Sequence, residues 1–173
     1  MKVSALALLG SFCPVPAFAY SNPSLFPNKR LSFYNVHTDE KIDVNYCIKG
    51  RYSTKGLKAI NYILRDFRTD DVCTIDMGLL DLLYGISRKL NIREPFHIVS
   101  GYRSPATNAM LRKKSSAVAR NSYHLKGKAI DVRLPDLSLY KLKKTAVKLK
   151  AGGVGYYPDS DFVHLDIGPI RHW

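Results

Sequence analysis

Residues 100–105 read Ser-Gly-Tyr-Arg-Ser-Pro, and after a polar linker residues 122–131 read Ser-Tyr-His-Leu-Lys-Gly-Lys-Ala-Ile-Asp. The second segment places His124 seven residues before Asp131, and Asp131 lies inside an apolar run. Another histidine, His164, follows in a downstream segment that reads Phe-Val-His-Leu-Asp. Imidazole nitrogens and carboxylate oxygens are common metal ligands, so this pattern indicates a metal site.

The residues around these side chains alternate between apolar and polar types, which predicts strands at residues 129–134 and 162–167. Side chains two positions apart lie on the same face of a strand, so Asp131 and His164 each lie opposite an apolar face. If the two strands pair, Asp131 and His164 can converge. His124 then arrives from the loop just before the first strand.

Two histidines and one carboxylate form a three-ligand zinc set that leaves a coordination position for water. This arrangement is typical of catalytic zinc sites. Zinc held in this way lowers the pKa of its water to about 7. Hydrolysis at such a site also needs a general base and a cation that stabilises an oxyanion.

The first candidate for the base is Asp161, three residues before His164, and the second is Asp166. Asp166 can alternatively orient a ligand histidine through a hydrogen bond. Arg103 is the candidate cation, because it lies in a tight turn directly after an expected strand. Acidic residues of the expected helical regions, Asp66 among them, receive no chemical role, since charges on the solvent side of amphipathic helices are common.

The N-terminus predicts a secretory signal peptide at residues 1–19. Lys2 precedes a short apolar run, and the small residue Ala19 ends an alanine-x-alanine cleavage site. The run is shorter than the roughly 20 residues of a transmembrane helix, so we expect secretion across the inner membrane to the periplasm. Residues 20–30 then form a flexible leader, and residues 31–173 form one domain. The alternative is that the first segment is a buried amphipathic element.

Composition supports one packed, positively charged domain. The chain has 173 residues, 46% of them apolar, and a formal charge of +13. Removing residues 1–19 takes away Lys2 and no acid, which leaves +12. Such a surface attracts polyanions, and outside the cytoplasm we expect cell-wall polymers rather than nucleic acid. Two cysteines remain, Cys47 and Cys73, so a disulfide is allowed and a thiolate zinc site is disfavoured.

The order of expected elements predicts an α+β fold, with an antiparallel sheet and flanking helices. Helices are expected after the capping residues Ser53, Asp76, Ser104 and Ser138, the third ending near residue 112. The expected strands are residues 31–36, 42–46, 96–100, 129–134, 154–157 and 162–167, and the first two form a β-hairpin. The basic segment at residues 112–121 is either a rim of the cleft or a solvated loop.

Ser-x-His-x-x-Gly-x-Ala-x-Asp, with the upstream Ser-Gly-Tyr-Arg and the downstream His-x-Asp, resembles the zinc D-Ala-D-Ala peptidases. The chain is more closely similar to the murein endopeptidase K-like branch of that family, in residues 64–68, 75–76, 79–84, 100–104, 129–135 and 163–169. The resemblance implies the hedgehog/DD-peptidase fold and a periplasmic enzyme that cleaves peptide cross-links in peptidoglycan. It makes His124, Asp131 and His164 the Zn²⁺ ligands. It also makes Arg103 the transition-state stabiliser and places Asp161 at the position of the base.

Two other functions stay open. A D,D-carboxypeptidase or dipeptidase acting on stem peptides would keep the same chemistry. It is disfavoured because Phe162 stands where that branch has a histidine. A non-catalytic peptidoglycan-binding module is disfavoured because ligands, acid and arginine occur together. His172 and Trp173 either line the cleft or simply end the chain, and Tyr123 is either a substrate contact or a packing residue. The type of cross-link and the oligomeric state are left open.

Overall fold

An eight-stranded sheet forms the centre of the computed structural model, which describes residues 27–115 and 118–173. In these residues the strands are β1 (Lys29–Asn35), β2 (Lys41–Ile48), β3 (Arg51–Tyr52), β4 (Phe96–Ser100), β5 (Ala129–Arg133), β6 (Gly153–Tyr157), β7 (Phe162–Asp166) and β8 (Arg171–His172). The helices are α1 (Thr54–Ile63), α2 (Met77–Leu90), α3 (Pro105–Lys114) and α4 (Leu139–Leu149), with a 3₁₀ segment η2 (Tyr123–Lys126). The expected signal peptide lies outside the described residues.

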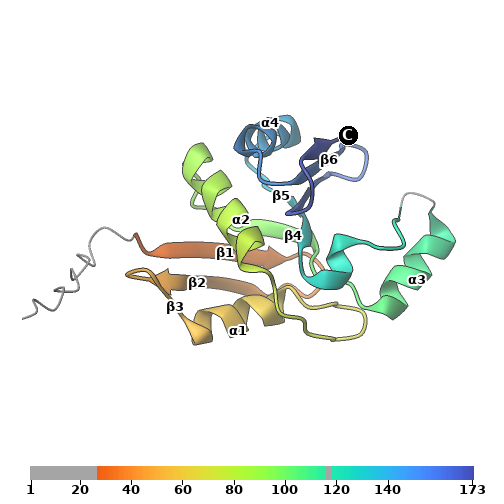
Figure 1. Cartoon of the computed structure of the whole chain (residues 1–173), viewed down its shortest axis with the longest axis horizontal. Helices are drawn as coiled ribbons and strands as arrows, with labels where there is room; N and C mark the ends of the chain where they lie inside the picture. Colours follow the sequence, from red (N-terminus) through yellow and green to blue (C-terminus); the bar gives the residue numbers. More distant parts are fainter. Residues whose placement is uncertain (1–26, 116–117) are drawn as a thin grey trace, which may run out of the picture.

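The strand order is β3-β2-β1-β4-β5-β7-β6-β8 (Figure 1). The predicted hairpin is confirmed, because β1 and β2 pair antiparallel. The prediction of an antiparallel sheet needs correction, since β1 pairs parallel with β4 and β6 pairs parallel with β8. A long connection through α1 and α2 returns the chain to the sheet beside β1 in the same direction, which a tight turn cannot do.

Helices cover the sheet and bury its apolar residues. Helix α1 packs against β2, α2 contacts β1 and α4, and α4 also contacts β6 and β7. Helix α3 projects from the body of the molecule next to η2 (Figure 1). In the sheet, Ile130, Val132, Val163 and Leu165 are fully buried, as the alternation of β5 and β7 predicts.

The predicted helix starts are confirmed at all four capping residues. The side chains of Ser53, Asp76, Ser104 and Ser138 each accept a hydrogen bond from a backbone N–H in the first turn of their helix. Helix α3 has Pro105 at its start and continues to Lys114, two residues beyond the expected end. None of the helices in the described residues is long and apolar enough to span a membrane. Cys47 and Cys73 are both free thiols.

Asp66 has a structural role that the sequence did not indicate. Because α1 ends at Ile63, Asp66 lies in the following turn and is 1% exposed, so the prediction of a solvent-facing charge was wrong. Its carboxylate accepts hydrogen bonds from the backbone N–H groups of Ser104 (2.8 Å) and Arg68 (3.0 Å). Burial raises the pKa of Asp66, but hydrogen bonds from Thr107 and Ser104 lower it by more. Asp66 therefore anchors the start of α3 and the turn before it.

Arg65 joins the β1–β2 turn to the end of α1. Its side chain is 8% exposed and donates to Glu40 Oε2 (2.7 Å), to the Tyr62 carbonyl (3.0 Å) and to Asp70 Oδ1 (3.0 Å). The hydrogen bond from Arg65 holds the pKa of Glu40 below its ordinary value. A buried guanidinium left without these acceptors would be costly.

Replacing Asp66 by Asn should lower the free energy of unfolding by about 2 kcal/mol, because an amide cannot accept all of the hydrogen bonds that the carboxylate accepts. Asp71→Asn is the control. Asp71 is exposed and bonds the hydroxyl of Thr69, so we expect a change within about 0.5 kcal/mol. Urea unfolding measures both. Equal effects of the two substitutions would contradict the anchoring role of Asp66.

Replacing Glu40 by Gln should destabilise the protein by roughly 1 kcal/mol at pH 7. The folded state lowers the pKa of Glu40, so its contribution exists above the unfolded pKa of about 4.3 and disappears as the pH falls through the lower folded value. The stability difference between wild type and Glu40→Gln should therefore shrink toward pH 3. The exposed Glu94→Gln serves as the charge-matched control in denaturant titrations. A difference independent of pH would reject the ion pair as its cause.

Candidate metal centre

The pairing of β5 with β7 places Asp131 directly opposite His164. His124 comes from η2, where the Ser122 side chain accepts from the His124 backbone N–H. The 3₁₀ turn closes at Gly127, whose φ of 62° and whose contact with the Thr74 carbonyl both require glycine: a Cβ there would lie 2.4 Å from that oxygen. The convergence expected from the strand pattern is thus confirmed in the geometry.

One atom from each of these three side chains meets the other two. Nε2 of His124 lies 3.2 Å from Nδ1 of His164, and Nδ1 of His164 lies 2.8 Å from Oδ1 of Asp131. His124 Nε2 and Asp131 Oδ1 are 3.2 Å apart. Among the residues that the structure describes, these three form the group whose ligand atoms all lie within 4.8 Å of one another.

The second polar atom of each side chain contacts a neighbouring group outside the cluster. Nδ1 of His124 is 2.7 Å from the carbonyl oxygen of Gly101. Nε2 of His164 is 3.0 Å from Oδ2 of Asp166, and Oδ2 of Asp131 accepts from Arg103 at 2.6 Å. Each side chain therefore presents its other atom to the same point. Such outer contacts orient metal ligands and select the histidine tautomer.

Burial and mutual charge shift the pKa values of the cluster. Burial lowers the pKa of His124. Burial would raise the pKa of Asp131, but the two histidines lower it well below the ordinary value. For His164, burial acts downward, and hydrogen bonds with Asp131 and Asp166 raise the pKa to about 9. Ligand atoms must be free of protons to bind a metal, so a bound cation would compete with the proton here.

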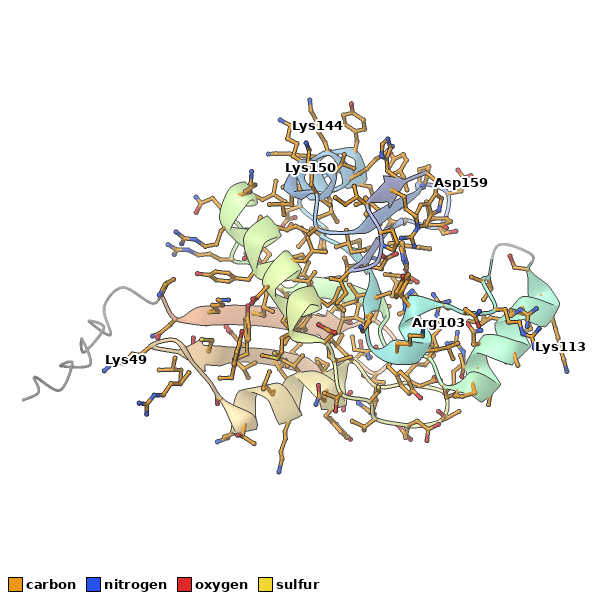
Figure 2. The ribbon with its side chains drawn as sticks, viewed as in Figure 1. Lys49, Arg103, Lys113, Lys144, Lys150 and Asp159 are labelled. Atoms are coloured by element: carbon orange, nitrogen blue, oxygen red, sulfur yellow. The ribbon has the colours of Figure 1, made fainter. Side chains whose placement is uncertain are left out.

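Arg103 occupies the position that the sequence predicted, in the turn after β4. Figure 2 shows its label beside η2, and its backbone N–H donates to the His124 carbonyl at 3.2 Å. The side chain donates through Nε to the Ser100 hydroxyl (3.0 Å) and through Nη2 to Asp131. These bonds fix the guanidinium at the edge of the cluster.

The two candidate bases lie in very different surroundings. Asp161 has a side chain that is 63% exposed, pairs with Arg133 at 3.0 Å, and lines a neighbouring cavity beside His97. The sequence had led us to expect Asp161 at the cluster, but in the structure its carboxylate lies beside Arg133 instead. Asp166 is fully buried and lies against His164.

Asp166 accepts hydrogen bonds from several groups at once. The donors are the backbone N–H of Gly153 (3.1 Å), the backbone N–H of Gly168 (2.8 Å) and the guanidinium of Arg171 (2.7 Å). Burial raises the pKa of Asp166, but the hydrogen bond with His164 and those from Gly168 and Arg171 lower it well below the usual range. Asp166 is thus an ionised carboxylate that accepts several hydrogen bonds and orients His164.

The cluster opens into a cavity of about 390 Å³. Besides the three cluster residues, its walls include Arg103, Tyr123, Tyr157, Arg171 and Trp173. Trp173 lines the cavity, one of the two alternatives that the sequence left open for it, and Tyr123 lies on the same wall. Arg171 was missed, because β8 spans two residues and carries no readable periodicity. Tyr157 lies in β6, which the sequence predicted as a strand, but the pattern gave its side chain no role.

Comparisons with known proteins give one consistent family. A family model described as peptidoglycan L,D-endopeptidase MepK matches residues 25–173. Peptidoglycan L,D-endopeptidase MepK of Escherichia coli (strain K12) is 41% identical over 174 residues, covering 100% of this chain and 94% of that protein. The probable peptidoglycan L,D-endopeptidase MepK of Haemophilus influenzae is 44% identical over 144 residues, covering 83% of this chain and 77% of that protein.

Proposed function

The chain belongs to the peptidase family of peptidoglycan L,D-endopeptidase MepK, and on this premise we propose that it is a zinc metallopeptidase that hydrolyses peptide cross-links in peptidoglycan. Membership confirms the resemblance to the murein endopeptidase K-like branch. The proposal includes the hedgehog/DD-peptidase fold for the domain and secretion to the periplasm, where peptidoglycan lies. The N-terminal pattern of residues 1–19 supports secretion.

The observation that carries the proposal is the convergence of one potential ligand atom each from His124, Asp131 and His164. Two imidazole nitrogens and one carboxylate oxygen suit zinc, and three protein ligands leave a position open, as in catalytic sites. When bound, the ion supplies Lewis-acid chemistry and a water nucleophile at neutral pH. The buried, hydrogen-bonded surroundings keep the three ligands oriented for it.

Arg103 stabilises the negative charge that develops on the carbonyl oxygen of the scissile amide. It lines the same cavity as the cluster, and its bonds to Ser100 and Asp131 hold the guanidinium in place before substrate arrives. A preorganised donor of this kind contributes roughly 10²–10³-fold to turnover.

We do not assign the role of general base to Asp161, because its carboxylate pairs with Arg133 and lines the neighbouring cavity. Asp166 has its carboxylate shared among His164, Arg171 and two backbone N–H groups. We therefore propose that the role of Asp166 is to orient His164.

The positive surface favours residence on an anionic cell wall. Figure 2 shows Lys144 at the outer edge of α4 and Lys113 at the outer side of α3, and both residues are exposed. Exposed cations raise the local concentration of a positively charged protein on an anionic polymer, an effect that salt weakens.

Replacing His124 by Ala should remove the metal and the activity together, because it deletes a ligand that is 1% exposed. The wild-type protein should carry about one zinc per chain by mass spectrometry of the metal and cleave purified cross-linked muropeptides, with activity lost to a chelator and restored by zinc. His97→Ala is the control, since His97 lies in β4 and lines the neighbouring cavity. Full zinc content and full cleavage in His124→Ala would reject the site.

Replacing Asp166 by Asn should weaken zinc binding by about 10–100-fold, because the amide cannot hold His164 and Arg171 as the carboxylate does. Asp161→Asn should leave zinc affinity and cleavage close to wild type, since Asp161 is exposed and paired with Arg133. Competition with a coloured zinc chelator measures affinity, and muropeptide digestion measures rate. A large loss of turnover in Asp161→Asn with normal zinc binding would restore Asp161 as the base.

A further inference from the structure

Arg171 is fixed on the cavity wall by contacts that the proposed hydrolysis does not use. Its Nη2 donates to Asp166 Oδ2 at 2.7 Å, and its Nη1 donates to Asp166 Oδ1 at 3.2 Å and to the Pro169 carbonyl at 3.0 Å. Its guanidinium lies over the rings of Tyr123 and Trp173, at 5.6 and 5.1 Å. Two parallel bonds to one carboxylate set both the place and the plane of the guanidinium.

The aromatic support of Arg171 is itself held in place. The backbone of Trp173 donates to the Val154 carbonyl, and its indole Nε1 donates to the Tyr157 hydroxyl at 2.8 Å. A Cβ at Gly155 would lie 2.8 Å from the Trp173 ring, so the absence of a side chain at that position gives the indole its room. The rings of Tyr123 and Trp173, with Trp173 held by these contacts, form the aromatic platform beneath Arg171.

Part of the Arg171 guanidinium stays available to a ligand. The three hydrogen bonds to Asp166 and Pro169 use three of its five N–H donors. The side chain is 40% exposed, whereas Asp166 beneath it is fully buried. The remaining donors lie on a residue that lines the cavity.

The charges around the cavity favour an anionic ligand. Two of its described lining residues are arginines, Arg103 and Arg171, and Asp131 is the carboxylate among them. A divalent ion at the cluster would make the balance more positive. Arg103 reaches the cluster from the Asp131 side, and Arg171 reaches it from the His164 side through Asp166. The two arginines therefore flank the candidate metal centre, Arg103 beside Asp131 and Arg171 on the side of His164.

Some peptidoglycan cross-links carry an anion next to the scissile amide. When the acceptor is a diamino dicarboxylic acid such as diaminopimelate, the scissile nitrogen is attached to a carbon that also bears a free carboxylate. We infer that Arg171 binds this carboxylate on the leaving side of the scissile amide, and so selects cross-links whose acceptor carboxylate is free. The inference rests on the proposed function. A planar guanidinium pairs with a planar carboxylate through two bonds, which an amide cannot reproduce.

Two synthetic cross-linked dimers, identical except that the acceptor carboxylate is free in one and a carboxamide in the other, test the inference. The wild-type protein should favour the free carboxylate by at least about 10-fold in kcat/KM. Arg171→Gln should bring that ratio close to one, mainly by raising KM for the carboxylate dimer, and Arg171→Lys should keep part of the preference. Arg133→Gln is the matched control, because Arg133 lines the neighbouring cavity, and it should keep the wild-type ratio.

Three results would overturn the inference: a wild-type protein that does not discriminate between the dimers, an Arg171→Gln variant that keeps the preference, or a variant that loses rate on both dimers equally. The last result, with a fall in zinc content, would mean that Arg171 only supports Asp166. Failure of the proposed function looks different, because neither dimer would then be cleaved by any variant. Calorimetric binding of the two dimers still decides in that case. Tighter binding of the carboxylate dimer by wild type, lost in Arg171→Gln, supports the inference, and equal binding overturns it.

Discussion

The antiparallel pairing of β5 with β7 is the constraint on which the site depends, because it sets Asp131 opposite His164. The register is protected by burial. Val132 and Val163, which are also paired, are fully buried on the apolar side, and a shift by one residue would turn them outward. The hydrophobic core thereby determines which side chains face the cavity, and the third member, His124, is delivered by the loop that leads into β5.

Placing polar groups at this depth is costly unless each finds a partner, and the fold supplies the partners from several elements. Gly101 and Arg103 come from the turn after β4, and Asp166 comes from the end of β7. Asp66 anchors that turn through Ser104. The same bonds that satisfy the buried atoms also orient the candidate ligands, so local stability and the geometry of the candidate metal centre have a common origin.

Local patterns predicted much of this arrangement, and long-range packing accounts for the rest. The alternation in residues 129–134 and the capping residues were readable because they depend on neighbours in sequence. Asp66 looked like a solvent-facing charge because its buried partners come from a distant segment. Asp161 has a left-handed backbone (φ 54°), and its carboxylate meets Arg133, which spacing from a histidine does not reveal. Arg171 gave no signal, since its role arises from contacts with Asp166 and the aromatic platform.

Anomalous diffraction at the zinc absorption edge, from crystals grown with zinc, tests the central claim most directly. The account predicts one strong peak about 2.0–2.2 Å from Nε2 of His124, Nδ1 of His164 and Oδ1 of Asp131 together. A peak bound elsewhere, or a cluster that stays hydrogen-bonded with zinc in excess, would contradict it.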